Sequence, residues 1–186
     1  MKKLTLLALS AAVLVSTSAV ASDFTGFGLG VGVGTTKYKD AKRISNVDLI
    51  GDYGIDYGNN LVGVIEGKLK LNNSTLHNEN GINYHHKLTE KTRLGVSYLQ
   101  GYRVTPNVLP YAKLGLQTTK FKREVRHGSR YATHSDTQNG IGFGAGVKAS
   151  LTPNFELGVE YLRTHDKFDG EKLRGNTFST NATYRF

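Results

Sequence analysis

The chain has 186 residues, a net charge of +9 at pH 7, and 22 glycines, 10 tyrosines and 8 phenylalanines, but no cysteine. The lack of cysteine excludes disulfides, thiolate chemistry and a lipid anchor attached to cysteine. Abundant glycine and aromatic residues, with a mean hydropathy of −0.35, favour strands with one apolar face over helices with a buried face.

The N-terminal segment has the pattern of a secretory signal. Lys2 and Lys3 precede an apolar run from Leu4 to Val15, and Ala19-Val20-Ala21 fits an A-x-A cleavage site. The run is shorter than the roughly 20 apolar residues of a spanning helix, so we predict cleavage after Ala21 rather than a membrane anchor. Cleavage would leave residues 22–186 as one exported domain with a net charge of +7, because Lys2 and Lys3 would be removed.

Eight segments follow in which apolar side chains alternate with glycine, polar or charged side chains, as in strands with one apolar face. In the first, Phe27, Leu29, Val31 and Val33 alternate with glycines. The segments are 25–35, 47–57, 61–71, 93–103, 108–117, 141–151, 155–161 and 177–186. The last alternates up to Phe186, and chain ends fray unless both strand edges are paired, which a closed barrel provides.

The connections between these segments alternate in length. Three are short, at 58–60, 105–107 and 152–154, and four are long and polar, at 37–46, 72–90, 120–139 and 164–176. Outer-membrane barrels have short periplasmic turns and longer extracellular loops. We therefore predict an all-β fold, an eight-stranded antiparallel up-and-down transmembrane β-barrel in the outer membrane of a Gram-negative bacterium. The alternative is a secreted soluble barrel of the lipocalin type.

The polar face of these strands is expected to fill the lumen, because eight strands leave an interior just wide enough for side chains. A hairpin register places Asp52 opposite Glu66, Asp48 opposite Lys70, and Lys148 opposite Glu156. The two neighbouring carboxylates then need cations from across the lumen. The predicted charge network is Asp48, Asp52, Glu66, Lys113, Lys148, Glu156, Glu160 and Arg185, with Asp56, Lys68, Lys70 and Arg93 on the same face. A network that plugs the barrel is favoured, and a narrow, low-conductance ion channel through it is the alternative.

The stretches "LPYAKLGL", "GFGAGVKASLTPNFELGVEYLRT" and "TYRF" resemble the small outer-membrane β-barrel superfamily. That group includes the membrane domain of outer-membrane protein A, its X-type relative and the opacity-type surface proteins. The resemblance implies that Tyr184 and Phe186 form a terminal signal read by the barrel assembly machinery. It also implies that Lys113, Glu160 and Arg185 are lumen residues. The alternative for Phe186 is an aromatic anchor at the membrane interface.

A cluster of basic residues marks the third long polar connection. It consists of Lys120, Lys122, Arg123, Arg126 and Arg130. Such a patch attracts polyanions, and arginine suits sulfate and phosphate geometry. Two ligand classes are open: a host glycosaminoglycan or glycoprotein, favoured at the tip (Arg126, Arg130), and phosphates of lipopolysaccharide, favoured near the rim (Lys120, Lys122). The expected protein is an adhesin-like monomer that also supports the envelope through contacts with membrane lipid. Nucleic acid is not an expected partner.

The sequence gives little support for an enzymatic function. Some small outer-membrane barrels act on lipid A through a Ser–His–acid set, but His165 lies in "LRTHDKFDG" without the serine. The adjacent pair His85-His86 lacks a further ligand motif for a metal. We therefore expect no catalytic residues, no metal site and no cofactor.

Overall fold

The computed structural model describes residues 24–38, 43–81, 84–127, 130–168 and 171–186. Among these residues no helix has the length and apolar character needed to cross a membrane. The described strands are β1 (Gly26–Tyr38), β2 (Ile44–Gly58), β3 (Leu61–Lys70), β4 (Ser74–Gly81), β5 (Tyr84–Tyr102), β6 (Val108–His127), β7 (Arg130–Thr152), β8 (Phe155–Phe168) and β9 (Glu171–Arg185).

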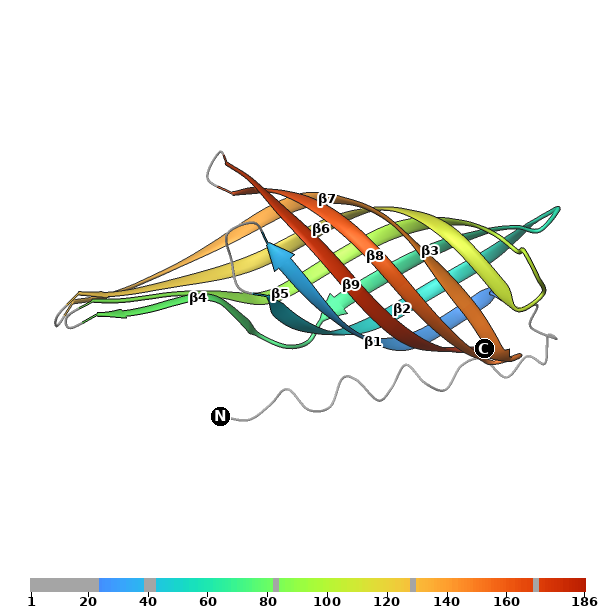
Figure 1. Cartoon of the computed structure of the whole chain (residues 1–186), viewed down its shortest axis with the longest axis horizontal. Helices are drawn as coiled ribbons and strands as arrows, with labels where there is room; N and C mark the ends of the chain where they lie inside the picture. Colours follow the sequence, from blue (N-terminus) through green and yellow to red (C-terminus); the bar gives the residue numbers. More distant parts are fainter. Residues whose placement is uncertain (1–23, 39–42, 82–83, 128–129, 169–170) are drawn as a thin grey trace.

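Eight of these strands close into a ring (Figure 1). Their order is β3-β2-β1-β9-β8-β7-β6-β5, each neighbouring pair is antiparallel, and pairing of β3 with β5 closes the ring. Strand β4 continues beyond the end of β3 and pairs with β5. The predicted eight-stranded up-and-down β-barrel is therefore confirmed.

The two ends of the barrel differ. At the turn end, short connections join β2 to β3, β5 to β6 and β7 to β8, and the C-terminus lies there (Figure 1). The first of these turns is tight, since Gly58, Asn59 and Asn60 all have positive φ, of 80°, 50° and 66°. Glycine and asparagine are the residues that adopt this left-handed region most easily. The opposite end is called the hairpin end below.

The prediction that residues 72–90, 120–139 and 164–176 are loops is wrong. Most of each segment is strand: β8 and β9 pair through 164–168 and 171–175, and β4, β5, β6 and β7 pair far beyond the rest of the barrel, at the left of Figure 1. We call this extension the raised sheet: β4 with residues 84–92 of β5, 120–127 of β6 and 130–139 of β7. Such a sheet needs no apolar face, so alternation of apolar residues, which marks strands against lipid, does not reveal it.

The barrel wall carries its apolar side chains on the outside. Leu116 is 67% exposed, Val96 58% and Phe178 58%, whereas Gln117, Thr177 and Ser179 beside Leu116 and Phe178 point inward and are buried. An apolar exterior with a polar interior is the arrangement of a barrel in lipid and the reverse of a soluble one. Exposed aromatic residues near the turn end include Tyr53, Tyr57, Tyr102 and Tyr184, as an interface girdle requires.

Candidate functional site: a charged lumen and a raised basic sheet

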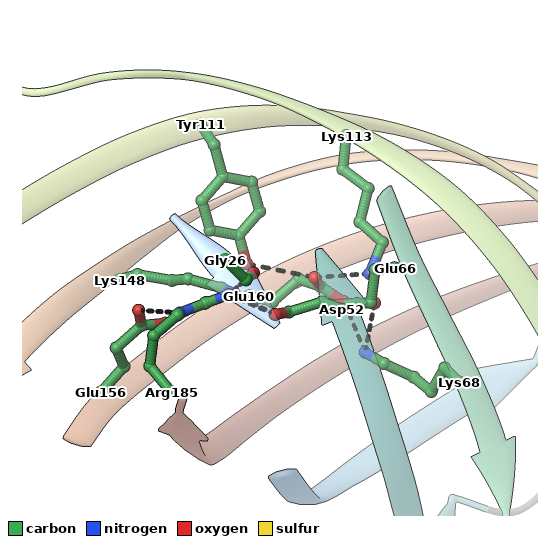
Figure 2. A network of polar contacts seen from close by, with 10 residues as sticks. All are labelled: Gly26, Asp52, Glu66, Lys68, Tyr111, Lys113, Lys148, Glu156, Glu160 and Arg185. Carbon is green, nitrogen blue, oxygen red and sulfur yellow. Dashed lines mark hydrogen bonds and ion pairs between the residues drawn. The ribbon is translucent and has the colours of Figure 1, made fainter. Parts of the chain in front are cut away.

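The first group of lumen charges, the turn-side cluster, joins Asp52, Lys148, Glu156 and Arg185 (Figure 2). Asp52 accepts hydrogen bonds from Lys148 Nζ and Arg185 Nη1, both at 2.7 Å. Arg185 also donates from Nε and Nη2 to the two Glu156 carboxylate oxygens, each at 2.8 Å. This bidentate geometry is the strongest form of an arginine–carboxylate pair. All four residues are buried and their charges cancel.

A second group, the central cluster, lies further from the turns and joins Glu66, Lys68, Lys113 and Glu160. Lys113 Nζ lies 2.7 Å from Glu66 Oε1 and 2.7 Å from Glu160 Oε2. Lys68 Nζ approaches the same two carboxylates, at 3.6 Å and 3.1 Å, and the Tyr111 hydroxyl donates to Glu160 at 3.1 Å. The two lysines come from β3 and β6, so the cluster ties the walls of the barrel together across the lumen (Figure 2).

The third group, the hairpin-side cluster, is centred on Glu90 of β5. Glu90 is fully buried and accepts hydrogen bonds from Arg93 Nε at 3.0 Å and Nη2 at 2.8 Å. Lys70 Nζ lies 3.1 Å from the same carboxylate. Asp48 lies between this cluster and the central one, where it lines a cavity with Lys68 and Arg93. Counted with Asp48, the cluster is also electrically neutral.

The lumen is filled along its length. At the turn end Phe24, Val62, Val64, Leu99 and Leu109 form a buried apolar plug that Tyr111 joins. The cavity beside Asp48 has a volume of about 40 Å³, room for a few water molecules. Ion pairs and apolar side chains thus occupy the path that an ion would follow.

The structure places all eight residues of the predicted lumen network inside the barrel, with one change in pairing. The expectation that Asp56 also points into the lumen is wrong, because Asp56 lies exposed next to the β2–β3 turn, where it pairs with Arg103. Asp52 pairs with Glu66 and Asp48 with Lys70 in the expected register. The expected pairing of Lys148 opposite Glu156 is wrong, because a register shift between Ser150 and Thr152 pairs Glu156 with Ser150 instead. Lys148 still reaches Glu156, at 3.7 Å.

Sequence reasoning missed Glu90 and the apolar plug. Glu90 falls within a segment that was expected to be a loop, and a register shift between Glu90 and Thr92 breaks the simple alternation with Arg93. A bulge of this kind turns a side chain to the other face. Val62 and Val64 could have been found, since they alternate in step with Glu66 and therefore lie on the same inward face of β3.

The five basic residues of the third polar connection lie on one hairpin of the raised sheet. Lys120 and Lys122 are on the outward face of β6, where Lys120 is exposed and Lys122 pairs with Glu124 at 2.5 Å. The backbones of Arg123 and Arg126 continue β6, pairing with His134 and Tyr131 of β7, and Arg130 begins β7 opposite His127. The side chains of these three arginines lie outside the described part of the structure. The backbone nevertheless gathers all five residues on two paired strands.

The terminal residues are fixed at the turn end. The backbone nitrogen of Phe186 donates to the Phe27 carbonyl at 2.9 Å, and the two rings lie 5.8 Å apart. The Tyr184 and Phe186 rings pack edge to face at 5.0 Å. Both side chains point outward and are about half exposed, so they are available to lipid or to a partner protein.

His165 of β8 contacts an aromatic residue of the neighbouring strand β7. Its ring stacks on Phe143 at a centroid distance of 5.5 Å on the outer wall. Among the described residues no group of three or more His, Asp or Glu side chains is arranged to hold a metal ion. The side chains of His85 and His86 lie outside the described set.

A family model for the "Outer membrane protein beta-barrel domain" matches residues 5–186. The chain belongs to this family. Membership places it in the outer membrane of a Gram-negative bacterium. It is also 31% identical over 107 residues to Protein opa of Haemophilus influenzae, an alignment that covers 55% of this chain and 88% of that protein.

Solved barrels show the same fold. The attachment invasion locus protein Ail of Yersinia pestis, in complex with the heparin analogue sucrose octasulfate, matches with a TM-score of 0.59 and 18% identity. That match covers 87% of this chain and 99% of Ail. Neisserial surface protein A matches with a TM-score of 0.54 and 18% identity, over 87% of this chain and 98% of that protein. In its architecture, the chain is thus an outer-membrane β-barrel of the Ail, Opa and NspA type.

Proposed function

We propose that this barrel is an adhesin-like surface protein whose raised sheet binds sulfated or phosphorylated polyanions outside the cell. The observation that carries the proposal is the gathering of Lys120, Lys122, Arg123, Arg126 and Arg130 on the β6–β7 hairpin, beyond the rim of the barrel. Several cations on one hairpin concentrate positive potential where a repeating polyanion can meet several of them at once.

The orientation follows from the two ends of the barrel. Short turns face the periplasm and longer connections face outward in outer-membrane barrels, so the raised sheet would project from the cell surface. The same proposal includes removal of residues 1–21 on export, which lie outside the described structure. Ail, a barrel of the same fold, has been solved with sucrose octasulfate, which supports a sulfated ligand class for this chain.

The closed lumen gives the protein its second proposed role, as a rigid element of the envelope without catalytic residues. Its three neutral clusters and apolar plug connect opposite walls of the barrel. The packed interior does not favour the alternative of a narrow channel, since every cluster lies on the path of an ion.

The test is a heparin titration of detergent-refolded protein at physiological salt. Wild type is compared with a variant in which Lys122, Arg123, Arg126 and Arg130 are changed to Ser. We expect the variant to bind heparin at least about tenfold more weakly, because charge-assisted contacts of about 1.5–3 kcal/mol each are lost. A control matched in charge changes Lys37, Arg43, Arg163 and Arg174, four cations elsewhere on the hairpin end, to Ser.

The control variant should keep most of the wild-type affinity, which would show that position and not net charge decides binding. If both variants lose affinity equally, the ligand senses only overall charge and the hairpin is not a site. If neither loses affinity, the proposed ligand site on the raised sheet is wrong.

A further inference from the structure

Histidine is concentrated on the raised sheet. Five of the six histidines of the chain lie there: His77 on β4, His85 and His86 on β5, His127 on β6 and His134 on β7. Histidine is the commonest metal ligand in proteins. The positions of these residues in the sheet therefore decide whether two of them can share one metal ion with an acidic residue.

The backbone register brings two of the histidines together with a glutamate. Cross-strand partners share a face of the sheet, and so do residues two apart on one strand. Glu79 of β4 pairs with His86 of β5, and His77 lies two residues before Glu79 on β4. We call His77, Glu79 and His86 the hairpin triad. All three therefore occupy one face of the β4–β5 hairpin, which lies at the left of Figure 1.

A β-bulge decides which histidine of β5 joins the triad. The pairs run from Thr75 with Thr89 directly to His77 with Leu88, so the register shifts by one residue on β4. A bulge of this kind moves the following residues to the other face relative to the partner strand. Without it, Glu79 would pair with His85 and His77 with Lys87, whose positive charge opposes a metal ion. The bulge thus selects His86 and leaves His85 on the opposite face.

The spacing of the three positions suits a single metal ion. Directly opposite residues of an antiparallel pair have β-carbons about 4.5–5.5 Å apart, and diagonal ones lie about 7–8 Å apart. Glu79 and His86 are directly opposite, and His77 and His86 are diagonal. A zinc ion lies about 2.0–2.2 Å from the histidine nitrogen or carboxylate oxygen that binds it, beyond the end of the side chain. Side chains of this length can converge on one ion from positions so spaced.

The register gives Glu79 no lysine or arginine as a neighbour on its face. The positions around it are His77 and Gly81 along β4, His86 opposite, and Tyr84 and Leu88 diagonally across. Strand β4 is the last in the order of the sheet, so β5 supplies all of its cross-strand partners. The groups placed to meet the carboxylate are therefore two imidazoles, which are metal ligands when neutral.

We propose that His77, Glu79 and His86 form a zinc site on the β4–β5 hairpin. Two histidines and one glutamate are a ligand set that zinc takes in proteins, and three protein ligands leave the fourth tetrahedral position to water or to an oxygen of an outside ligand. The ion joins both strands of the hairpin, and so it holds the edge strand β4 onto β5.

This inference is independent of the polyanion-binding role proposed above. The basic residues of that role lie on the β6–β7 hairpin, whereas the triad lies on β4 and β5. It is also independent of the orientation of the barrel in the membrane. Zinc binding and heparin binding can therefore be measured separately, and either can fail without the other.

The test is a zinc titration of the chain of residues 22–186, refolded in detergent without a histidine tag. Wild type is compared with the single variants His77→Ala, Glu79→Gln, His86→Ala and His85→Ala. The last is the matched control, because it removes the neighbouring histidine on the opposite face. Folding of each variant is checked by heat-modifiable mobility on gels. Zinc chloride is then added in competition with a chromogenic chelator, with excess magnesium present.

We expect wild type and His85→Ala to bind one zinc ion per chain. Magnesium should not compete, since it prefers oxygen ligands. Each triad variant should bind zinc about tenfold or more weakly, because even the loss of an outer-shell partner of a metal ligand typically costs 10–100-fold in affinity.

Three results would overturn the inference. One is wild-type protein that binds no zinc at a ratio of one ion per chain. Another is an equal loss of affinity in His85→Ala and His86→Ala, which would mean that zinc meets surface histidines without regard to the register. The third is wild-type affinity in Glu79→Gln, which would leave the site with two ligands. Heparin titration of the same variants in the presence of a chelator reports separately on the β6–β7 hairpin.

Discussion

At the scale of single residues, the lumen is governed by the need to pair every buried charge. Asp52 illustrates this, because it is buried between Lys148 and Arg185, both at 2.7 Å. Asp56 lies on the same strand near the turn, but it is exposed and pairs with Arg103. Removing one member of a buried pair leaves an uncompensated charge, whereas an exposed pair is screened by water.

The same substitution at these two positions should therefore have different effects. We expect Asp52→Asn to lower the free energy of unfolding by about 3–5 kcal/mol and Asp56→Asn by less than about 1 kcal/mol. Guanidinium unfolding of the two variants in phosphatidylcholine vesicles measures the difference. Similar values for both would mean that water screens the turn-side cluster, and that the lumen is more open than the structure shows.

At the scale of the strands, close approach between backbones decides where glycine is needed. A side-chain carbon at Gly30, on the inward face of β1, would lie 2.5 Å from the Ala182 carbonyl oxygen of β9. At Gly51, on the outward face of β2, no atom lies within 4 Å of the same carbon. Gly30 and Gly51 both lie within strands, but only Gly30 is required by the close approach of a neighbouring backbone.

We predict that Gly30→Ala destabilises the barrel by about 1–3 kcal/mol, as overpacking does, while Gly51→Ala is neutral or nearly so. Folding yield and heat-modifiable gel mobility of the two refolded variants provide the measurement. Equal yields would show that β1 and β9 can move apart without cost.

The sequence predicted the fold and the lumen residues only where a strand has lipid on one face and the lumen on the other. Alternation placed Asp52, Glu66, Lys113 and Arg185 in the lumen, because a wall with lipid on one side has a strict period of two. The rule failed at Glu90 and at the Lys148–Glu156 pairing, where register shifts change the parity or the partner. It also failed for the raised sheet, since strands with water on both faces carry no apolar alternation.

At the scale of the whole molecule, charge is divided between the inside and the outside. The described lumen holds six acidic side chains, Asp48, Asp52, Glu66, Glu90, Glu156 and Glu160, and six basic ones, Lys68, Lys70, Arg93, Lys113, Lys148 and Arg185. The lumen is therefore neutral, and the net charge of +9 belongs to the rest of the chain. This division separates a paired, neutral interior from a basic exterior.

The chain end provides a test of assembly as distinct from stability. If Tyr184 and Phe186 act as a signal for the barrel assembly machinery, Phe186→Ser should sharply reduce the amount of folded barrel in the outer membrane of cells. Refolding of the same variant in detergent, where no machinery is present, should be close to wild type. The control variant Phe178→Ser, which removes another exposed phenylalanine, should not lower assembly in cells. Equal losses in cells and in detergent would make Phe186 an anchor only.

The measurement that tests the central claim most directly is the binding of intact cells to immobilised heparin. Cells displaying wild type are compared with cells displaying equal amounts of the variant in which Lys122, Arg123, Arg126 and Arg130 are changed to Ser, with and without soluble sucrose octasulfate. The account predicts that wild-type cells bind, that sucrose octasulfate competes, and that variant cells bind no better than cells without the protein. Equal binding by wild-type and variant cells would contradict it.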